Sequence, residues 1–316
     1  MTVTSDPPTY DGAFTVDVED YFHVSAFVSS VRPCDWGRFP CRVEASTHKL
    51  LNLAAANDTR GTFFVLGWVA EHYPQLVTEI QQAGHEVGCH SHAHQLVYEL
   101  GADGFRQDLV RARDILESIT GQPVTLFRAP SFSITSKSLW ALQVLREEGF
   151  QVDSSIYPIR HDRYGIPGAP VMPHLIETPA GELAEFPGMV FEAGRTAVPV
   201  GGGGYLRLLP WMVTERLLGS VRKQGRPLNV YVHPWEVDPD QPRIACSFKS
   251  RFRHYQNLRS TMPKLQKMLK RFRLTTMSEV LTTLELPRIP SVIRSSPEAP
   301  RSTDTTAAAE VREAVS

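Results

Sequence analysis

The alternation of apolar and polar positions along the chain predicts repeated strand–helix units. Runs rich in β-branched and aromatic residues predict buried strands at 13–18, 61–70, 85–90, 125–132 and 228–236. Apolar residues spaced three and four positions apart predict helices at 46–57, 74–83, 109–120, 138–149, 263–274 and 277–286. Strands and helices that alternate at this spacing are typical of an α/β fold with a parallel sheet whose two faces are covered.

Two stretches depart from this pattern. Residues 156–204 are rich in proline and glycine, which predicts irregular excursions; within them, Gly201–Gly204 indicates a flexible lid or a tight backbone crossing. From Pro287 onward there is no aromatic residue and there are four prolines, so 287–316 is predicted to be a disordered tail. We therefore expect an N-terminal extension over 1–9 and one domain over 10–286, with a distinct C-terminal part from about residue 150.

Composition and charge narrow the class of protein. The 316 residues carry 33 Lys and Arg against 34 Asp and Glu, which argues against a dedicated nucleic-acid binder. The sequence has neither an apolar run near the roughly 18 residues of a membrane helix nor a recognisable signal peptide, so it predicts a cytoplasmic protein without a transmembrane segment. Residues 249–273 contain nine Lys and Arg and no acid, which indicates either a solvated face or contact with an anionic, lipid-linked substrate.

The end regions of four of the predicted strands carry reactive side chains. They are Asp17, Glu19 and Asp20; His90, His92 and His94; Arg128; and His233. In α/β folds of this kind the chemistry lies at the C-terminal ends of the strands. His90 and His94 can point into one space if the chain turns helically, and a carboxylate beside them would complete a catalytic metal site with open positions. His92, between them, is expected to support the site or to point away.

These motifs resemble those of the polysaccharide deacetylases (NodB homology, carbohydrate esterase family 4). GHEVGCHSHAH is similar to their H-[ST]-x-x-H motif, TVDVED to the acidic motif, FRAPSF to R-x-P-[FY] with one residue inserted, and VYVHPWE to the last motif. The resemblance implies a distorted (β/α) barrel of the NodB type. RHDRYG, PVGGGGYLRLLP and RFRHYQNL resemble the subgroup associated with exosortase/PEP-CTERM exopolysaccharide loci.

The resemblance also implies roles for the acidic motif, which departs from the family form. The family has two adjacent aspartates, a base followed by a metal ligand, whereas this chain has Asp17-Val18-Glu19-Asp20. We expect Asp17 to be the base and Asp20 the metal ligand beside His90 and His94, with Glu19 as the alternative carboxylate. Asp17 and Glu19 share one face of an extended strand, and Asp20 follows where the chain can turn.

The remaining roles follow from the chemistry of amide hydrolysis. The leaving amine needs a proton, which His233 can supply, and Arg128 can orient the base carboxylate of Asp17. Trp235 either packs near the strand ends or lines the sugar pocket. The other residues expected to contact substrate are Pro130, Phe132 and Tyr157.

The resemblance implies a metal-dependent hydrolase that removes N-acetyl groups from a sugar of a polysaccharide or of its lipid-linked precursor, in exopolysaccharide biosynthesis. Imidazole ligands favour zinc, with cobalt, nickel and iron as alternatives. The partner is a glycan, and no nucleic acid is expected. Two other hypotheses are a small amide or imide hydrolase of the same barrel family and a catalytically silent carbohydrate-binding protein.

Overall fold

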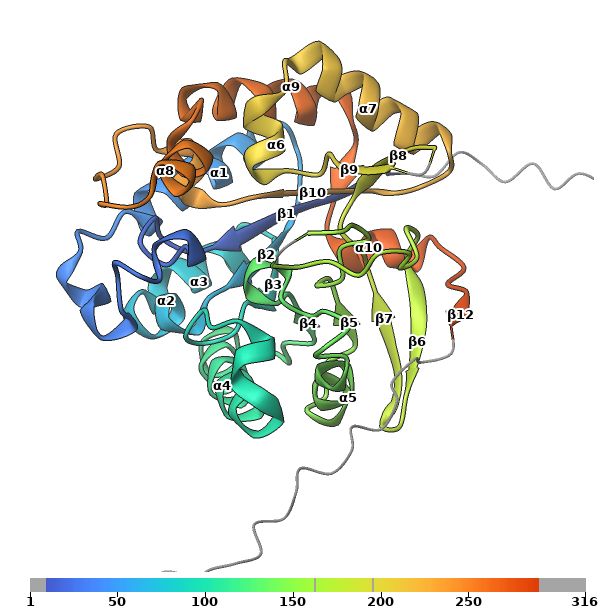
Figure 1. The fold of residues 1–316 in the computed structure, drawn as a ribbon, viewed down its shortest axis with the longest axis horizontal. Helices are drawn as coiled ribbons and strands as arrows, with labels where there is room; N and C mark the ends of the chain where they lie inside the picture. The colour runs from blue at the N-terminus through green and yellow to red at the C-terminus, as the bar shows by residue number, and fades with distance from the viewer. Residues whose placement is uncertain (1–9, 162, 195, 290–316) are drawn as a thin grey trace, which may run out of the picture.

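The computed structural model describes residues 10–161, 163–194 and 196–289, and a mainly parallel sheet forms their centre (Figure 1). Its strand order is β10-β1-β2-β3-β4-β5-β7-β6-β12, with β11 beside β1. The strands are β1 Gly12–Val18, β2 Thr62–Val65, β3 Glu86–Cys89, β4 Leu126–Phe127, β5 Val152–Asp153, β6 His174–Thr178, β7 Gly181–Glu185, β10 Leu228–Val232, β11 Leu274–Thr275 and β12 Arg288–Ile289. Only the β6–β7 pair is antiparallel in this sheet, so the predicted α/β fold with a parallel sheet is confirmed.

Helices surround the sheet (Figure 1). They are α1 Val43–Ala55, α2 Gly67–His72, α3 Pro74–Gln82, α4 Val97–Thr120, α5 Trp140–Glu147, α6 Gly203–Leu208, α7 Trp211–Lys223, α8 Phe248–Tyr255, α9 Thr261–Arg271 and α10 Met277–Thr282. Short 3₁₀ turns lie at η1 Ser25–Phe27, η2 Pro33–Arg38, η3 Pro130–Phe132, η4 Pro234–Val237 and η5 Leu258–Ser260. Within the described ranges, none of the helices combines the length and the apolar character needed to cross a membrane.

The sheet curls strongly, since β1 and β10 run nearly horizontally in Figure 1 while β6 and β7 run nearly vertically. Strand pairing among the described residues does not close a barrel, because the order ends at β10 and β12. The free side of β10 contacts Gly201 and Gly202 instead: the Tyr231 N–H donates to the Gly201 carbonyl over 2.9 Å. A Cβ on Gly202 would lie 1.9 Å from the Tyr231 carbonyl oxygen, so the four-glycine segment is a tight backbone crossing, as one of the two interpretations predicted.

Several predicted elements differ from the structure. In 61–70 only Thr62–Val65 is a strand, and α2 follows because Gly67 and Trp68 donate their N–H groups to carbonyls of the histidine segment. The segment predicted to be irregular, 156–204, contains β6, β7 and a separate hairpin of β8 Val190–Ala193 and β9 Thr196–Pro199. Helices α6, α7 and α8 were not predicted.

The predicted tail boundary is also wrong by a few residues, because Arg288 and Ile289 pair with Leu175 and Ile176 as β12. The rest of the predicted tail, 290–316, and the N-terminal extension 1–9 lie outside the described residues.

Candidate active site

Four parallel strands deliver polar side chains to one edge of the sheet. Every residue of β1 is buried, and its register aligns Asp17 with Phe64 of β2 and Val16 with Val232 of β10. His90 follows β3, Arg128 follows β4 and His233 follows β10. Because neighbouring parallel strands end at the same edge, these side chains converge although they are far apart in the sequence.

Glu19, His90 and His94 form a buried cluster in which one nitrogen or oxygen of each residue lies within 4.8 Å of the others. The imidazole centroids of His90 and His94 are 5.5 Å apart. Glu19 Oε2 lies 2.5 Å from His94 Nε2, but the contact lacks hydrogen-bond geometry and this oxygen has no hydrogen-bond donor among the described residues. A buried carboxylate oxygen without a donor, next to two imidazoles, has the chemistry of a metal ligand set.

The surroundings of His90 favour the neutral imidazole that a metal requires. Its Nδ1 lies 2.8 Å from the Arg128 carbonyl oxygen, which leaves Nε2 for the cluster and fixes the orientation of the ring. Burial lowers the pKa of His90 to about 4, against the opposing effect of the Asp17 carboxylate. His90 is therefore uncharged near neutral pH.

The histidine segment does not form the helical turn that the sequence analysis gave as the condition for His90 and His94 to meet. Ser91 and His94 have φ values of 68° and 51°, so two non-glycine residues adopt the left-handed region. The Asp108 carboxylate of α4 holds this loop, because it accepts the N–H groups of His92 and Ala93 over 2.7 and 2.9 Å and the hydroxyl of Ser91. The loop conformation, rather than one turn of helix, brings His90 and His94 together.

Asp20 does not join the cluster, contrary to its predicted role as the metal ligand. Its Oδ2 accepts the backbone N–H groups of Arg42 and Val43 over 2.6 and 2.8 Å and the thiol of Cys41 over 3.0 Å. Its Oδ1 accepts the Tyr21 N–H over 2.8 Å. Asp20 thus caps the start of α1, and the carboxylate beside the two imidazoles is the alternative, Glu19.

Asp17 lies beside the cluster and is held by Arg128, as predicted. Arg128 is fully buried, and its Nη1 donates to Asp17 Oδ1 over 2.8 Å and to Thr15 Oγ1 over 2.7 Å. Its Nη2 donates to Ser154 Oγ over 3.0 Å. These contacts fix the guanidinium, which in turn fixes one carboxylate oxygen and leaves Asp17 Oδ2 facing His233.

His233 faces both carboxylates, since its Nε2 lies 3.8 Å from Asp17 Oδ2 and 3.8 Å from Glu19 Oε1. Its Nδ1 lies 2.7 Å from Oε1 of Glu236, and the other oxygen of Glu236 lies 2.8 Å from Nε of the buried Arg207. Burial lowers the pKa of His233, but Glu236, Glu19 and Asp17 outweigh it and raise this pKa to about 9. His233 is therefore protonated at neutral pH.

Sequence reasoning left Glu236 without a role and did not identify Arg207. The position of Glu236, three residues after a histidine that ends a strand, was the available signal for it. Arg207 had no such signal, because it lies in α6 and reaches His233 only through Glu236. Its other donors are satisfied by backbone carbonyls of α8 and of Gln256.

Trp235 and Tyr157 are packed into the wall of the site, which for Trp235 is one of its two interpretations and for Tyr157 differs from the expected contact with substrate. Trp235 is stacked between His233 and His254, and its Nε1 donates to Glu19 Oε1 over 3.0 Å. Tyr157 is 1% exposed, and its hydroxyl donates to the Met189 carbonyl over 3.0 Å. Neither ring has an open face for a sugar.

The other two predicted contacts, Pro130 and Phe132, are also buried. Phe132 packs its ring against Tyr157 and Tyr231, with centroids 5.0 and 5.1 Å away. Substrate contact by Pro130 and Phe132 stays a prediction.

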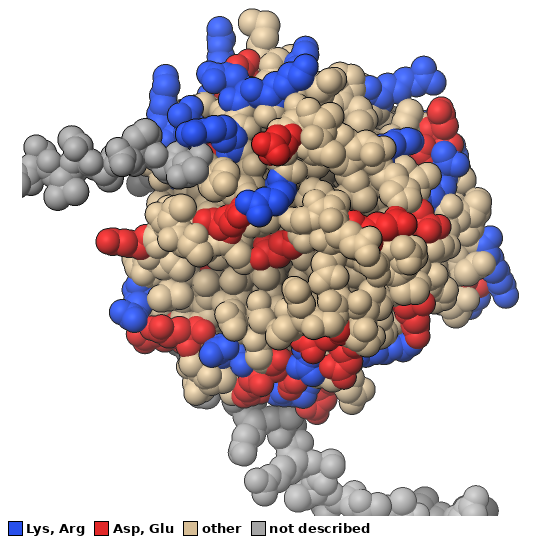
Figure 2. Space-filling view, turned by 180° about the vertical axis from the view of Figure 1, so that it is seen from behind, with Lys and Arg blue, Asp and Glu red and all other residues tan. Residues whose placement is uncertain are grey.

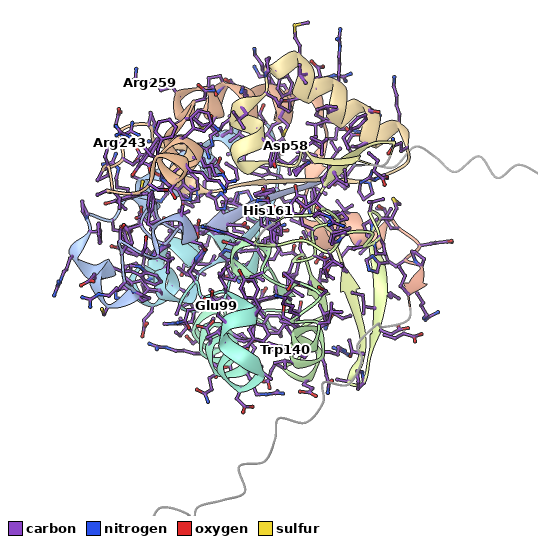
Figure 3. All side chains as sticks on the ribbon, in the orientation of Figure 1. Asp58, Glu99, Trp140, His161, Arg243 and Arg259 are labelled. Carbon is purple, nitrogen blue, oxygen red and sulfur yellow. The ribbon has the colours of Figure 1, made fainter. Side chains whose placement is uncertain are left out.

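One hollow reaches the cluster, and a second hollow adjoins the first. The first, of about 330 Å³, is lined by His94 together with His23, Trp36 and Glu99. The second, also about 330 Å³, is lined by Ser131, Tyr231, Arg163 and Arg253, and both are lined by Val24 and Ser25. Figure 3 labels one residue of each hollow, Glu99 at the start of α4 and His161 near the centre of the molecule.

Comparison with protein families divides the chain in two. Residues 35–152 match the polysaccharide deacetylase family, and residues 154–282 match a domain of unknown function, DUF3473. The first range contains His90, His94 and Arg128, and the second contains Arg207, His233 and Glu236.

Individual relatives agree with this division. A peptidoglycan-N-acetylglucosamine deacetylase of Bacillus cereus is 25% identical over 149 residues, which are 43% of this chain and 53% of that protein. A chitin deacetylase of Pestalotiopsis is 30% identical over 121 residues, which are 37% of this chain and 41% of the relative. The chain thus spans about half the length of these relatives.

Among solved structures, a predicted polysaccharide deacetylase of Mycobacterium smegmatis superimposes with a TM-score of 0.58 at 19% identity. The superposition covers 94% of this chain and 98% of that protein, so the two share their fold. The comparisons therefore support a polysaccharide deacetylase domain in the first half of this chain, within a fold that the Mycobacterium smegmatis protein shares over nearly its whole length.

Proposed function

We propose that the protein is a metal-dependent hydrolase that removes N-acetyl groups from a sugar of a polysaccharide or of its precursor. The observation that carries this proposal is the arrangement of Glu19, His90 and His94 beside a carboxylate held by arginine and a protonated histidine. This arrangement supplies a ligand set, a base and an acid within one buried site. The relationship of residues 35–152 to the polysaccharide deacetylases supports the choice of an amide on a sugar as substrate.

The ligand set fits a divalent metal. Two imidazoles and one carboxylate match a common set of catalytic zinc ligands, and no hydrogen-bond donor among the described residues competes with a metal for Glu19 Oε2. Zinc is our first choice, with cobalt, nickel and iron as alternatives. A metal bound there would polarise the amide carbonyl and favour attack by water.

The protein's own residues would move the protons. Asp17, oriented by Arg128 through Oδ1, accepts the proton of the attacking water through Oδ2, the oxygen that faces His233. His233 holds a proton at neutral pH and can donate it from Nε2 to the leaving nitrogen. Glu236 accepts from Nδ1 of His233 and so keeps Nε2 pointed at the site.

We further propose that the substrate is an anionic, lipid-linked intermediate of exopolysaccharide synthesis. The second hollow is lined by Arg163 and Arg253, and its described lining contains no acidic residue. Arg253 belongs to the basic stretch 249–273, which the sequence analysis associated with an anionic substrate. The cytoplasmic location stays a prediction.

Acetate release from N-acetylhexosamine oligomers by zinc-loaded protein tests the proposal. His90→Ala and Asp17→Asn should each lower kcat/KM by at least about 100-fold, because they remove a metal ligand and the base. His92→Gln is the matched control: His92 lies in the same loop, but its Nε2 contacts Glu71 outside the cluster, 3.1 Å away. A chelator should abolish the activity and zinc should restore it.

The same assay separates the alternatives. Acetate release that persists in both His90→Ala and Asp17→Asn would refute the proposed site. Glycan binding without acetate release by metal-loaded parent protein would favour the silent carbohydrate-binding protein. Hydrolysis of small cyclic amides in place of the oligomers would favour the amide or imide hydrolase.

A further inference from the structure

Helix α8 presents an unusual edge to solvent. Phe248 and Phe252 are 84% and 53% exposed, and they lie four residues apart, on one side of the helix. His254 is buried, and it projects about 200° around the helix from Phe252 because each residue turns the helix by about 100°. The two phenylalanines therefore point away from the protein, where water contact is unfavourable.

Basic side chains flank this apolar edge. Lys249 and Arg251 are exposed, and each projects about 100° from a phenylalanine, one on each side. Neither forms an ion pair with a carboxylate in the part of the chain that the structure describes. We call Phe248, Lys249, Arg251 and Phe252 the α8 surface.

The segments that contact α8 also carry exposed apolar side chains. Val28 is 71% exposed and directly follows η1, whose Phe27 ring packs 4.7 Å from that of His254. Leu208 is 46% exposed and ends α6, which is joined to α8 by the hydrogen bond from Arg207 to the His254 carbonyl. Exposed apolar side chains thus lie on α8 and on the two segments that contact it.

From these observations we infer that the α8 surface binds the headgroup region of an anionic lipid bilayer. A helix with an apolar edge flanked by Lys and Arg is the pattern of helices that lie in a membrane interface. The basic side chains would remain at the level of the lipid phosphates while the phenylalanine rings enter the acyl boundary. Binding of lipid by this surface does not depend on the proposed hydrolase activity.

The charge of the α8 surface disfavours a second copy of the chain as its occupant. Packing two copies through this edge would place Lys249 and Arg251 of one against the same residues of the other, and like charges at an interface are unfavourable. An anionic bilayer neutralises both residues. Seen from behind, acidic and basic side chains are interspersed over the lower part of the molecule, whereas Lys and Arg gather along its upper edge (Figure 2).

The basic stretch 249–273 does not act as one face. Lys264 of α9 turns inward and donates to the carbonyls of Leu206, Arg207 and Leu209 over 2.8, 3.0 and 2.8 Å. Arg271 pairs with Glu215, 2.8 Å away. Lys267 and Lys270 of α9 are also exposed, but the exposed large apolar side chains next to these basic residues in the sequence, Phe248 and Phe252, both lie on α8. Basic and apolar side chains are therefore exposed together on α8, and Arg243 and Arg259 lie on the same side of the molecule (Figure 3).

The position of α8 connects the lipid surface with the candidate active site. Arg253 of α8 and Leu208 line the second hollow, whose other side is formed by Ser131 and Tyr231. Tyr231 lies in β10, two residues before His233. A glycan anchored in a bilayer under α8 would thus meet this hollow, which shares Val24 and Ser25 with the hollow that His94 lines.

Flotation of the full chain with lipid vesicles tests the inference. Vesicles with about one third phosphatidylglycerol should bind the protein, and vesicles of phosphatidylcholine alone should bind it much less. Lys249→Gln/Arg251→Gln should weaken binding to anionic vesicles about 25-fold, since each basic residue near such a surface contributes about fivefold. Phe248→Ser/Phe252→Ser should weaken it by at least about 100-fold, at roughly tenfold for each buried ring.

Met212→Ser is the matched control, because Met212 is 67% exposed on α7 and lines a different hollow. Its vesicle binding should equal that of the parent, and thermal unfolding confirms that each variant is folded. The inference fails if the parent ignores anionic vesicles or if Phe248→Ser/Phe252→Ser binds them as the parent does. A dimer in solution that the same double substitution dissociates would assign the surface to a second copy and would also overturn the inference.

Discussion

Substitution of the two neighbouring carboxylates, Glu19 and Asp20, separates metal binding from folding. Glu19→Gln removes the only carboxylate in the described cluster with His90 and His94, while Trp235 can still donate to the remaining carbonyl oxygen. Loss of a residue that merely supports a metal ligand costs about 10–100-fold in metal affinity, so loss of the ligand itself should cost more than about 100-fold. The variant should keep its fold, because it removes a buried charge without removing the acceptor for Trp235.

Asp20→Asn should lower the stability of the fold and leave metal affinity unchanged. Asp20 uses both oxygens as acceptors for N–H and S–H groups at the start of α1, and an asparagine keeps only one of them. A buried donor left without an acceptor costs about 1–3 kcal/mol, and for a chain of this size each kcal/mol lowers Tm by about 2–4 °C. We therefore expect Tm to fall by about 2–12 °C with metal affinity close to that of the parent.

The assay pairs a competition titration of zinc against a chromophoric chelator with calorimetric unfolding of the metal-free proteins. The metal-free form is needed because bound metal would itself raise Tm. The expected result is weak zinc binding in Glu19→Gln and lowered Tm in Asp20→Asn. Weak zinc binding in Asp20→Asn together with parental affinity in Glu19→Gln would refute our assignment of the ligand and restore the one predicted from sequence.

Three further substitutions test the buried charges. Glu236→Gln should lower the pKa of His233 from about 9, so the alkaline limb of kcat/KM for acetate release should move to lower pH; an unmoved limb would contradict the assigned acid. Arg207→Met removes the cation beside Oε2 of the buried Glu236, whose Oε1 still accepts from His233, and should cost up to about 3–5 kcal/mol of unfolding free energy. Part of this loss should be recovered by Arg207→Met/Glu236→Gln in urea titrations. Burial raises the pKa of Asp153 to about 6, and burial together with the Asp153 carboxylate raises the pKa of Glu185 well above its ordinary value. The native state therefore binds more protons than the unfolded state and loses stability as the pH rises through the range in which these two carboxyl groups ionise. Glu185→Gln should therefore gain about 1–3 kcal/mol relative to the parent between pH 5 and pH 8, and a constant difference between the two proteins would contradict this reasoning.

The sequence could predict the site residues that directly follow strands. His90, Arg128 and His233 each come next after a run that is apolar and β-rich, and a parallel sheet aligns such positions without further information. The choice between Glu19 and Asp20 required the path of the chain after β1. There the Glu19 N–H bonds to the Asp17 carbonyl over 3.0 Å, and the resulting turn directs Asp20 to α1.

Other parts of the site depended on contacts that have no local signature. Arg207 lies in a helix that the glycine-rich segment did not predict, and only tertiary packing brings it to Glu236. The joint position of His90 and His94 was predicted, but for the wrong reason, because Asp108 stabilises a left-handed loop in place of a helical turn. Interactions between segments override local propensity at these points.

The second half of the described chain is part of the site rather than an appended module. Residues 154–282, which match a domain of unknown function, contribute His233 with its partner Glu236, while 35–152 contribute both imidazoles of the cluster. The two ranges are joined through β1, whose residues 12–16 pair in register with 228–232 of β10. Because β1 also carries Asp17 and ends next to Glu19, the proposed base, ligand and acid are aligned by this one central strand. Neither matched range holds all of these groups, so the described chain must fold as a whole for the site to form.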